Sequence, residues 1–327
     1  MTTSISIYGV GRSGTKLTQL VTCMALARQY HMCDLSYEPF YWANRHCTQV
    51  SIPGIREHRR LPLFLTEAAT QALDSPYLRA KTRRRDGVPL VNKFIRGNGR
   101  IRLIDRLATP DLSVFVFRPV VSVLDSLRRC QFDLLGEGQQ YPSDQPRLME
   151  EIRSNPELTV SASFLDRCVS TEDLNALWWL SMNEAALTAF AEIHAAGRPV
   201  ILIDQRWFAA HPLDGAQRLL TSAGVTAIDI PVGFLHDAWM RQETVLQTVA
   251  GVTSPLEYVE TDELPFRDRI SCHPADGEMV QRTFVPREPD PALAMHPLYR
   301  EIDEAFVRML NRFDPAVVCA PSIPNQE

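Results

Sequence analysis

The stretch "SISIYGVGRSGTKLTQL", residues 4–20, decides which fold class the chain belongs to. Its first residues alternate between polar and apolar up to Tyr8, which is typical of a β-strand. Gly9, Gly11 and Gly14 follow, and after them apolar residues recur at helical spacing. We predict a strand, a glycine-rich loop and a helix. Such a unit binds anions, because the loop amides and the helix N-terminus can point at phosphate oxygens.

This loop differs from the loop that binds nucleoside triphosphates. That motif has a lysine after its last glycine, followed by a serine or threonine that holds Mg²⁺. Here Thr15 follows Gly14, and Lys16 stands where the Mg²⁺ ligand belongs. Successive residues of a helix point about 100° apart, so Lys16 cannot replace the missing lysine. The loop predicts phosphate binding without the two residues that an ATP–Mg²⁺ site needs.

A second motif lies in "VFVFRPVVSVLDSLRRC", residues 114–130. The continuous apolar run is typical of a parallel strand that is buried on both faces. The strand ends at Arg118, whose guanidinium offers a charged, two-pronged donor for a phosphate. Ser126 follows on a predicted helix over residues 120–129 and adds a hydroxyl donor. Each residue also has an ordinary interpretation, since Arg118 can pair with an acid and Ser126 can be a small helix residue.

Together the two motifs resemble those of the sulfotransferases of bacterial and carbohydrate type, which use 3′-phosphoadenosine 5′-phosphosulfate (PAPS). That family has a P-loop-like fold with a threonine at the nucleotide-lysine position. The resemblance implies that Arg118 and Ser126 hold the 3′-phosphate, although the family usually has Arg-Asx-Pro where this chain has Arg118-Pro119. ATP has no 3′-phosphate, so the pair argues against a kinase. The residues implied for the 5′-phosphosulfate are Gly11, Arg12, Ser13, Gly14, Thr15 and Lys16.

The same resemblance assigns the catalytic roles. Arg12 would stabilise the leaving phosphate. The segment "SYEPFYW", residues 36–42, resembles the family's "EP" segment, whose glutamate faces the acceptor hydroxyl. Glu38 is therefore expected to be the general base, with a pKa raised by burial among aromatic side chains. His46 is the rival base, and Lys93 is expected to contact the sulfonate or the phosphate. In the ordinary interpretation these three are a surface glutamate, a loop histidine and a solvated lysine.

Three further residues have two interpretations each. Trp178 and Trp179 lie early in a long predicted helix and can stack on adenine or on the acceptor, but such aromatic residues are more often part of a core. Asp204 ends an apolar strand, as a Mg²⁺-site aspartate does. Because the loop lacks the Ser or Thr ligand, we interpret Asp204 as structural and expect no metal.

Along the whole chain, strand patterns alternate with helix patterns, which predicts an α/β fold. We expect three layers with a mainly parallel sheet between helices, as in P-loop-like sulfotransferases, and a site at the carboxyl ends of the strands. The predicted strands cover 4–8, 89–94, 112–118 and 199–204, and the predicted helices cover 15–30, 99–107, 120–129, 172–195, 212–225, 234–251 and 292–312.

We expect a single domain over residues 1–327, of which about 4–230 resembles the sulfotransferase family. Residues 133–160 are rich in Gly, Gln, Pro, Ser and Glu, and we predict an insertion or lid outside the core. Residues 231–327 match nothing in that family, and 252–290 are expected to be irregular.

Composition excludes some classes of partner. The chain has 327 residues, 45% hydrophobic and 22% charged, with a net charge of −5, so a nucleic-acid partner is not expected. Residues 79–106 are an exception, with ten Lys and Arg against two acids. They indicate either a small-anion site or a solvated face.

No targeting segment or membrane span is visible, and the seven cysteines form no CxxC pair, so we expect a cytoplasmic protein with reduced thiols. Three functions stay open: a PAPS-dependent sulfotransferase with product adenosine 3′,5′-bisphosphate, a P-loop small-metabolite kinase using ATP–Mg²⁺, and a non-catalytic nucleotide-binding protein. The acceptor would be a small molecule or a saccharide with a hydroxyl or an amine. Its identity and the oligomeric state cannot be read from the sequence.

Overall fold

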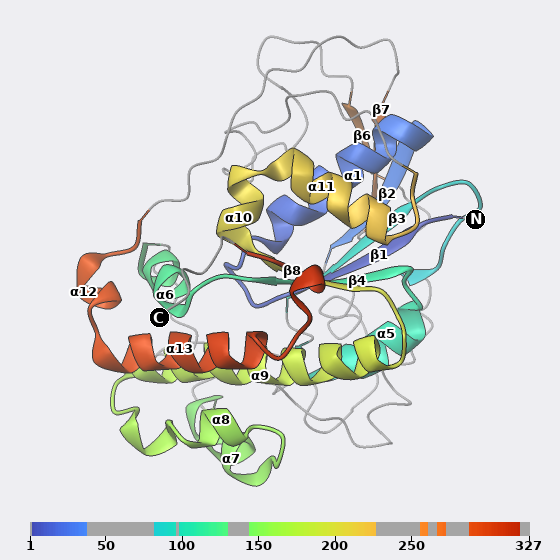
Figure 1. Cartoon of the computed structure of the whole chain (residues 1–327). Coiled ribbons are helices and arrows are strands. Elements are labelled where there is room, and N and C mark those ends of the chain that lie inside the picture. The colour runs from blue at the N-terminus through green and yellow to red at the C-terminus, as the bar shows by residue number, and fades with distance from the viewer. Residues whose placement is uncertain are drawn as a thin grey trace.

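The computed structural model describes a layered α/β fold (Figure 1). The described residues are 2–37, 82–95, 98–129, 144–226, 256–260, 267–272 and 288–320. In these ranges an eight-stranded sheet has the order β6-β7-β2-β3-β1-β4-β5-β8. Neighbours from β2 to β8 are parallel, while β7 pairs antiparallel with β2 and β6. The predicted α/β class with a mainly parallel sheet is therefore confirmed.

The strands are short and mostly apolar. Their bounds are β1 (Ser4–Tyr8), β2 (Met32–Tyr37), β3 (Leu90–Phe94), β4 (Leu112–Phe117), β5 (Val200–Asp204), β6 (Leu256–Glu260), β7 (Arg267–Cys272) and β8 (Val318–Cys319).

Helices cover both faces of the sheet (Figure 1). On one face lie α1 (Thr15–Tyr30), α10 (Gln205–Ala210) and α11 (Pro212–Ser222). On the other lie α5 (Ile101–Ala108), α6 (Val120–Arg129), α9 (Thr171–Ala195) and α13 (Pro297–Leu310). The shorter elements are η1 (Asn98–Arg100), α7 (Asp144–Ser154), α8 (Thr159–Ala162), η2 (Leu165–Arg167), α12 (Pro291–Ala294) and η4 (Pro315–Val317).

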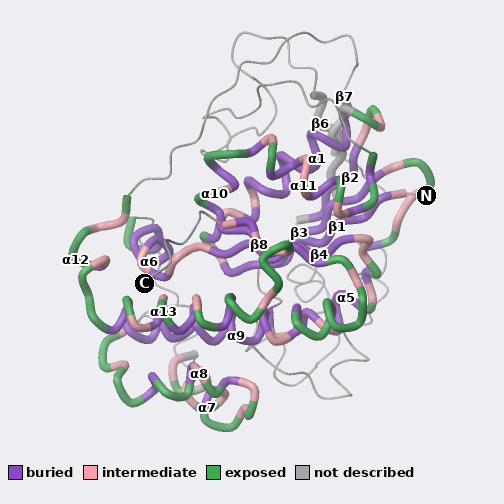
Figure 2. Tube along the Cα trace, in the orientation of Figure 1, coloured by how far each residue is buried: buried purple, intermediate pink, exposed green. Residues whose placement is uncertain are grey.

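The sheet is buried on both faces, as Figure 2 shows along its central strands. Alternate side chains of β4 point to opposite layers, so its whole sequence is apolar apart from one serine. Val114 and Val116 join the core under α1, and Phe115 and Phe117 join the core under α9. The ring of Phe117 packs 5.3 Å from that of Phe306 on α13. Two apolar layers thus hold the sheet in place.

The long helix α9 is part of this core. It begins at a capping box in which Ser170 and Asp173 exchange hydrogen bonds with each other's backbone. Trp178 and Trp179 are both buried, and the ring of Trp179 lies 5.0 Å from that of Phe306. The interpretation of the two tryptophans as core residues is confirmed.

The sheet order places a switch point at β1. β3 lies beside β1 on one side, and β4, the next strand along the described chain, lies on its other side. Residues Tyr8 and Phe115 are paired in register, so the carboxyl ends of β1 and β4 are neighbours. In open α/β sheets such a point is where ligands bind. Both predicted motifs follow these two strand ends.

Residues 144–160 differ from the prediction. We expected no core contribution from 133–160, but 144–154 form helix α7. Leu148, Ile152 and Leu158 are almost fully buried in the core under α9. Leu148 and Ile152 lie one turn apart on one face of α7, a pattern that the polar composition of the stretch concealed. Residues 133–143 lie outside the described residues, and a lid role stays a prediction.

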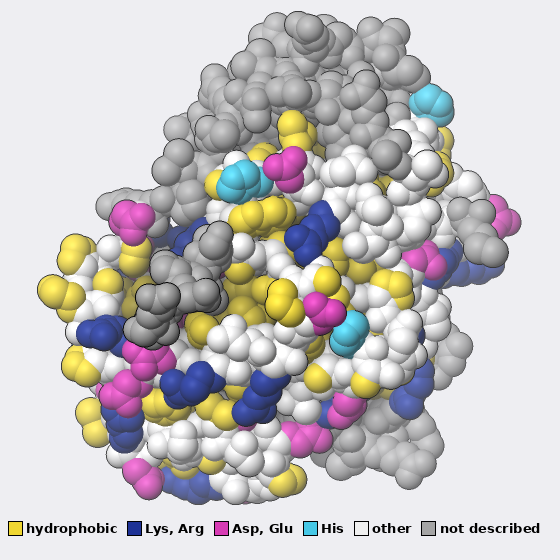
Figure 3. Space-filling model, viewed as in Figure 1, with side chains coloured by type: hydrophobic (Ala, Val, Ile, Leu, Met, Phe, Trp, Pro, Cys, Tyr) yellow, Lys and Arg dark blue, Asp and Glu magenta, His cyan; other side chains and the backbone are white. Residues whose placement is uncertain are grey.

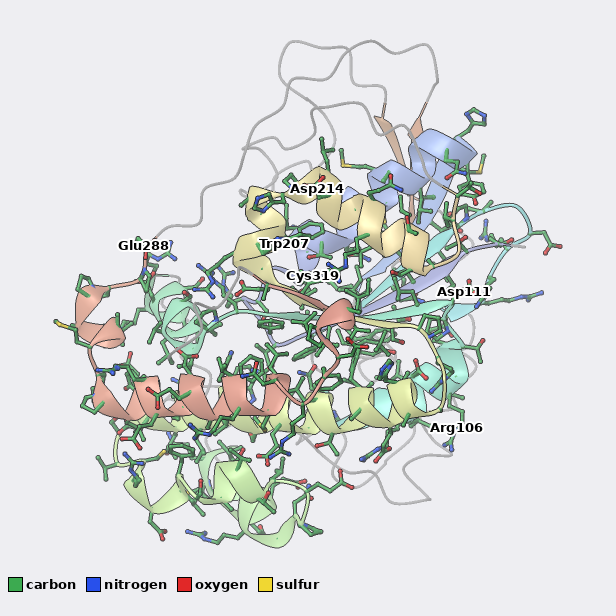
Figure 4. The ribbon with its side chains drawn as sticks, in the orientation of Figure 1. Arg106, Asp111, Trp207, Asp214, Glu288 and Cys319 are labelled. Carbon is green, nitrogen blue, oxygen red and sulfur yellow. The ribbon has the colours of Figure 1, made fainter. Side chains whose placement is uncertain are left out.

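The C-terminal part also differs. Residues 252–290 contain β6 and β7, so the expectation of irregular structure was wrong there. The predicted helix over 292–312 is two helices, because Pro297 begins a new one after α12 ends. The two-residue strand β8 extends the sheet beyond β5, and Figure 4 labels its Cys319. The predicted helix over 234–251 lies outside the described residues.

The described part of the chain was also examined for membrane-spanning helices and for disulfides. None of its helices has both the length and the apolar character that a membrane crossing requires. Its cysteines are unpaired, namely Cys23, Cys33, Cys168 and Cys319, and three of these four are buried.

Glu184 on α9 holds the start of α8, which suggests a test of the fold. Its buried carboxylate accepts from the amides of Val160 and Ser161, both at 2.8 Å, and from the Ser161 hydroxyl at 2.6 Å. We expect Glu184→Ala to lower the free energy of unfolding by about 3 kcal/mol, because buried donors lose their acceptor. The control is Glu192→Ala on the same helix, whose pair with Arg102 is exposed and worth under about 1 kcal/mol. Equal losses in urea unfolding would contradict this assignment.

Candidate phosphate site

The loop between β1 and α1 leaves backbone amides available to a ligand. The loop is fixed by two bonds, Gly9 N to Phe94 O and Ser13 N to Val10 O, each at 3.2 Å. The N-terminus of α1 has no side-chain cap and no acidic residue in its first turn. The first amides of a helix have no partner within the helix, so they can bind an anion together with the helix dipole.

Two glycines let this loop pack closely against the neighbouring strand ends. A Cβ at Gly9 would lie 2.5 Å from the carbonyl oxygen of Val116 in β4. Gly14 has a φ of +89°, and a Cβ there would lie 2.2 Å from Cγ of Gln205. Neither position can hold a side chain without a shift of its surroundings. Gly11 is different, because its Cβ position is open.

Arg12 connects the loop to α6. Its Nε donates a hydrogen bond to Ser126 Oγ at 2.9 Å. The Arg12 backbone has a φ of 74°, a left-handed conformation that costs a non-glycine residue about 1–2 kcal/mol. The two residues that the resemblance assigned to different phosphate groups are thus in direct contact across 114 residues of sequence.

Arg118 lies beside this contact with an unsatisfied donor. Its Nε is buried and has no hydrogen-bond partner among the described residues. Burial lowers the pKa of Arg118, and the charges of Arg129, Arg12 and Arg206 lower it further, while Asp125 raises it. Several guanidinium groups therefore act on one another at the carboxyl edge of the sheet. An anion placed there would supply the partner that the Arg118 donor lacks.

Some of this charge is balanced by the protein itself. Arg129 pairs with Asp125 at 2.9 Å, and Arg206 pairs with Asp204 at 2.6 Å.

Sequence reasoning missed Arg129 and Arg206. Arg206 had a usable signal, because it follows the apolar strand β5 by two residues and so lies at the same sheet edge as Arg118. Arg129 had none beyond its place on α6.

The remaining loop residues lie inward. Ser13 and Thr15 are buried, and the Ser13 hydroxyl has no hydrogen-bond partner in the described part of the chain. Lys16 is half-buried, and burial lowers its pKa. Gln205, another residue that the sequence analysis missed, is buried against Gly14, and its Oε1 accepts no hydrogen bond from a described residue.

The predicted catalytic residues are only partly described. Lys93 is buried on β3, which excludes the interpretation as a solvated lysine. It is in register with Ile7 of β1 and Tyr37 of β2. Glu38 and His46 lie outside the described residues, so their roles as base stay predictions.

Asp204 has a structural role, as expected. Its carboxylate accepts the backbone amide of Arg206 at 2.8 Å, which caps α10, and it also binds the Arg206 side chain.

Two arginines of the basic stretch 79–106 pair with acidic residues of the protein itself. Arg84 binds Asp111 at 2.8 Å, and Arg102 binds Glu157 and Glu192 at 2.9 and 2.5 Å. Arg100 is almost fully buried, which lowers its pKa to about 10. Figure 3 likewise shows acidic and basic side chains side by side over α13, so the visible face there carries mixed charge.

Comparisons with known proteins found a structural likeness. No family model and no curated protein matches the chain. A solved structure that matches is the sulfotransferase domain of the olefin synthase from Synechococcus PCC 7002, with 14% identity and a TM-score of 0.40. The match covers 94% of this chain and 95% of that one.

The loop geometry generates a prediction about its glycines. We expect Gly9→Ala and Gly14→Ala to weaken binding of adenosine 3′,5′-bisphosphate at least about tenfold, because a tenfold loss needs only about 1.4 kcal/mol. Gly11→Ala is the control and should change binding less than about twofold, since its Cβ position is open. Calorimetric titration measures all three, and a loss with Gly11→Ala equal to the others would contradict the packing argument.

Proposed function

We propose that this protein is a sulfotransferase that moves the sulfuryl group of PAPS to a hydroxyl or amine of a small-molecule or saccharide acceptor. One observation carries the proposal. The unpaired, buried donor of Arg118 lies next to the Arg12–Ser126 contact, where the ends of β1 and β4 meet. This arrangement supports an anionic ligand that has two phosphate groups.

The position of each group suggests how the nucleotide would lie. Arg118 and Ser126 follow β4, where they suit a 3′-phosphate, and the loop after β1 suits the 5′-phosphosulfate. Because Arg12 bonds to Ser126, the two half-sites are close enough for a single nucleotide to span both. The chain lacks the Lys and the Ser or Thr of an ATP loop, which favours this ligand over ATP–Mg²⁺.

The proposed reaction needs charge stabilisation more than covalent help from the protein. The bond between sulfur and the 5′-phosphate oxygen breaks, a new bond forms between sulfur and the acceptor atom, and the acceptor proton passes to a base. Negative charge that develops on the leaving phosphate would be stabilised by Arg12 and by the amides of Gly14, Thr15 and Lys16. Arg12 serves as a fixed cation here, since a guanidinium does not give up its proton.

The base is proposed to be Glu38, with His46 as the alternative. Glu38 directly follows β2, whose last residue, Tyr37, is in register with Lys93. Lys93 in turn is in register with Ile7, two residues before the phosphate loop. The end of β2 therefore lies one strand, β3, away from β1, which leads into the glycine-rich loop.

Ligand binding tests the proposal without knowledge of the acceptor. We expect adenosine 3′,5′-bisphosphate to raise the melting temperature in the absence of Mg²⁺, and ATP–Mg²⁺ to leave it unchanged. Stabilisation by ATP–Mg²⁺ alone would overturn the sulfotransferase proposal in favour of a kinase. Transfer of labelled sulfate from PAPS to a metabolite extract then separates an enzyme from a non-catalytic nucleotide-binding protein and identifies the acceptor.

Arg118 gives a sharper test of the 3′-phosphate. Arg118→Ala should weaken adenosine 3′,5′-bisphosphate about thirtyfold, or about 2 kcal/mol, and AMP less than about threefold. The matched control is Arg128→Ala on α6. The Arg128 side chain is exposed and pairs with Glu172 at 2.5 Å. Equal weakening of both nucleotides by Arg118→Ala would remove its 3′-phosphate role.

Once an acceptor is known, Glu38→Gln decides the base. Replacing the carboxylate should lower kcat at least about a hundredfold while the affinity for the bisphosphate stays unchanged. Full turnover in Glu38→Gln would move the assignment to His46, which His46→Gln would test in the same assay.

A further inference from the structure

Helix α6 begins without a cap from its own neighbours. Arg118 and Pro119 precede it, and neither side chain has an oxygen that can accept from the amides of the first turn. Instead the amide of Val120 donates to Oδ1 of Asp303 at 2.8 Å. Asp303 lies on α13, 183 residues further along the chain. One amide of the first turn of α6, that of Val120, is therefore bound by the C-terminal part of the protein.

The helix that carries Asp303 is firmly attached to the core. Phe306, one turn further on α13, packs 5.0 Å from the ring of Trp179 on α9. At the start of α13, the Tyr299 hydroxyl donates to Asp173 at 3.0 Å. Asp303 thus connects α6 to two helices that are packed together. Movement of the first turn of α6 would break this connection.

Asp303 also interacts electrostatically with Arg206, one of the arginines whose charges act on Arg118. Arg206, which pairs with Asp204, is acted on by the charges of Asp303 and Glu288, and Arg206 in turn acts on Arg118. Figure 4 shows Glu288 on the side of the molecule where α6 and α12 lie. Through Arg206, the carboxylate of Asp303 is therefore linked electrostatically to the guanidinium of Arg118.

We propose that Asp303 is a positioning residue for Arg118 and Ser126. By binding the first turn of α6, it sets the spacing at which the strand-end guanidinium and the helix hydroxyl meet a phosphate. For the identity of that ligand, a nucleoside 3′-phosphate, this inference rests on the proposed function. It gives residues 288–320 a part in forming the site.

Two variants and a control test the proposal by calorimetric titration with adenosine 3′,5′-bisphosphate and with AMP. Asp303→Ala should weaken the bisphosphate about tenfold and AMP less than about twofold, since a lost cap affects only the 3′-phosphate half-site. Asp303→Asn should restore the bisphosphate affinity to within about threefold, because its amide oxygen still accepts from Val120. Glu304→Ala, an exposed neighbour on α13, should change nothing.

Unchanged affinity for the bisphosphate in Asp303→Ala, or equal weakening of both nucleotides, would overturn the proposal. Hydrogen exchange at the first turn of α6 provides a readout that needs no ligand. The Val120 amide should exchange faster in Asp303→Ala than in the wild type or Asp303→Asn, and unchanged exchange would also overturn the positioning role. A wild-type protein that bound no bisphosphate would instead overturn the proposed function, while the exchange result would still decide whether Asp303 holds α6.

The pH dependence of stability gives one more readout. Burial raises the pKa of Asp303 from its ordinary 3.8 to about 7, against the opposing effects of the Val120 amide and Arg206, while Asp204 adds to the rise. Between about pH 4 and pH 7, Asp303 is therefore protonated in the folded protein but ionised in the unfolded chain. The melting temperature of the wild type should fall relative to Asp303→Asn as pH rises through this window, and then level off. A difference that does not vary with pH would contradict this environment for Asp303.

Discussion

The close packing of the loop after β1 is the constraint on which the rest of the site depends. The backbone at Gly9 lies against the Val116 carbonyl of β4, and the backbone at Gly14 lies against Gln205, directly after β5. The ends of β1, β4 and β5 are thereby brought together, with the Gln205 side chain packed directly on the Gly14 backbone. In this arrangement Arg12 bonds to Ser126, and the charges of Arg12 and Arg206 act on Arg118.

Carboxylates divide the cations of this edge into paired and unpaired ones. Asp125 and Asp204 each bind one arginine, which limits the repulsion within the cluster. The Nε of Arg118 is a buried donor without a hydrogen-bond partner among the residues that the structure describes. If carboxylates paired with every arginine at this edge of the sheet, a phosphate would gain little from binding there. If no arginine were paired, the guanidinium groups would repel one another. In the structure two arginines are paired, and the donor without a partner, Arg118 Nε, lies beside the glycine-rich loop.

The sequence predicted the parts of the fold that have strong local patterns. β1, β4, β5, α1, α6 and α9 were recognisable because apolar runs and helical periodicity continue over whole elements. β2, β6, β7 and β8 were missed, since short strands toward the sheet edges follow no such pattern and depend on pairing with distant segments. Likewise Arg12, Arg118 and Ser126 were found through their motifs. Arg129 and Asp303 were not, because only the tertiary structure brings them to the site, and Arg206 was overlooked although it follows the apolar strand β5 by two residues.

The bond between Val120 and Asp303 has a consequence for how the protein is made. The two residues are separated by 183 positions, so at translation rates of 5–20 residues per second the partner of α6 is synthesised roughly 10–40 s after the helix itself. The strand β8, which extends the sheet, is synthesised later still. Pairings between segments so distant in sequence form slowly. A nascent chain can therefore assemble its glycine-rich loop early, but it completes the first turn of the helix beside that loop only after α13 has been synthesised.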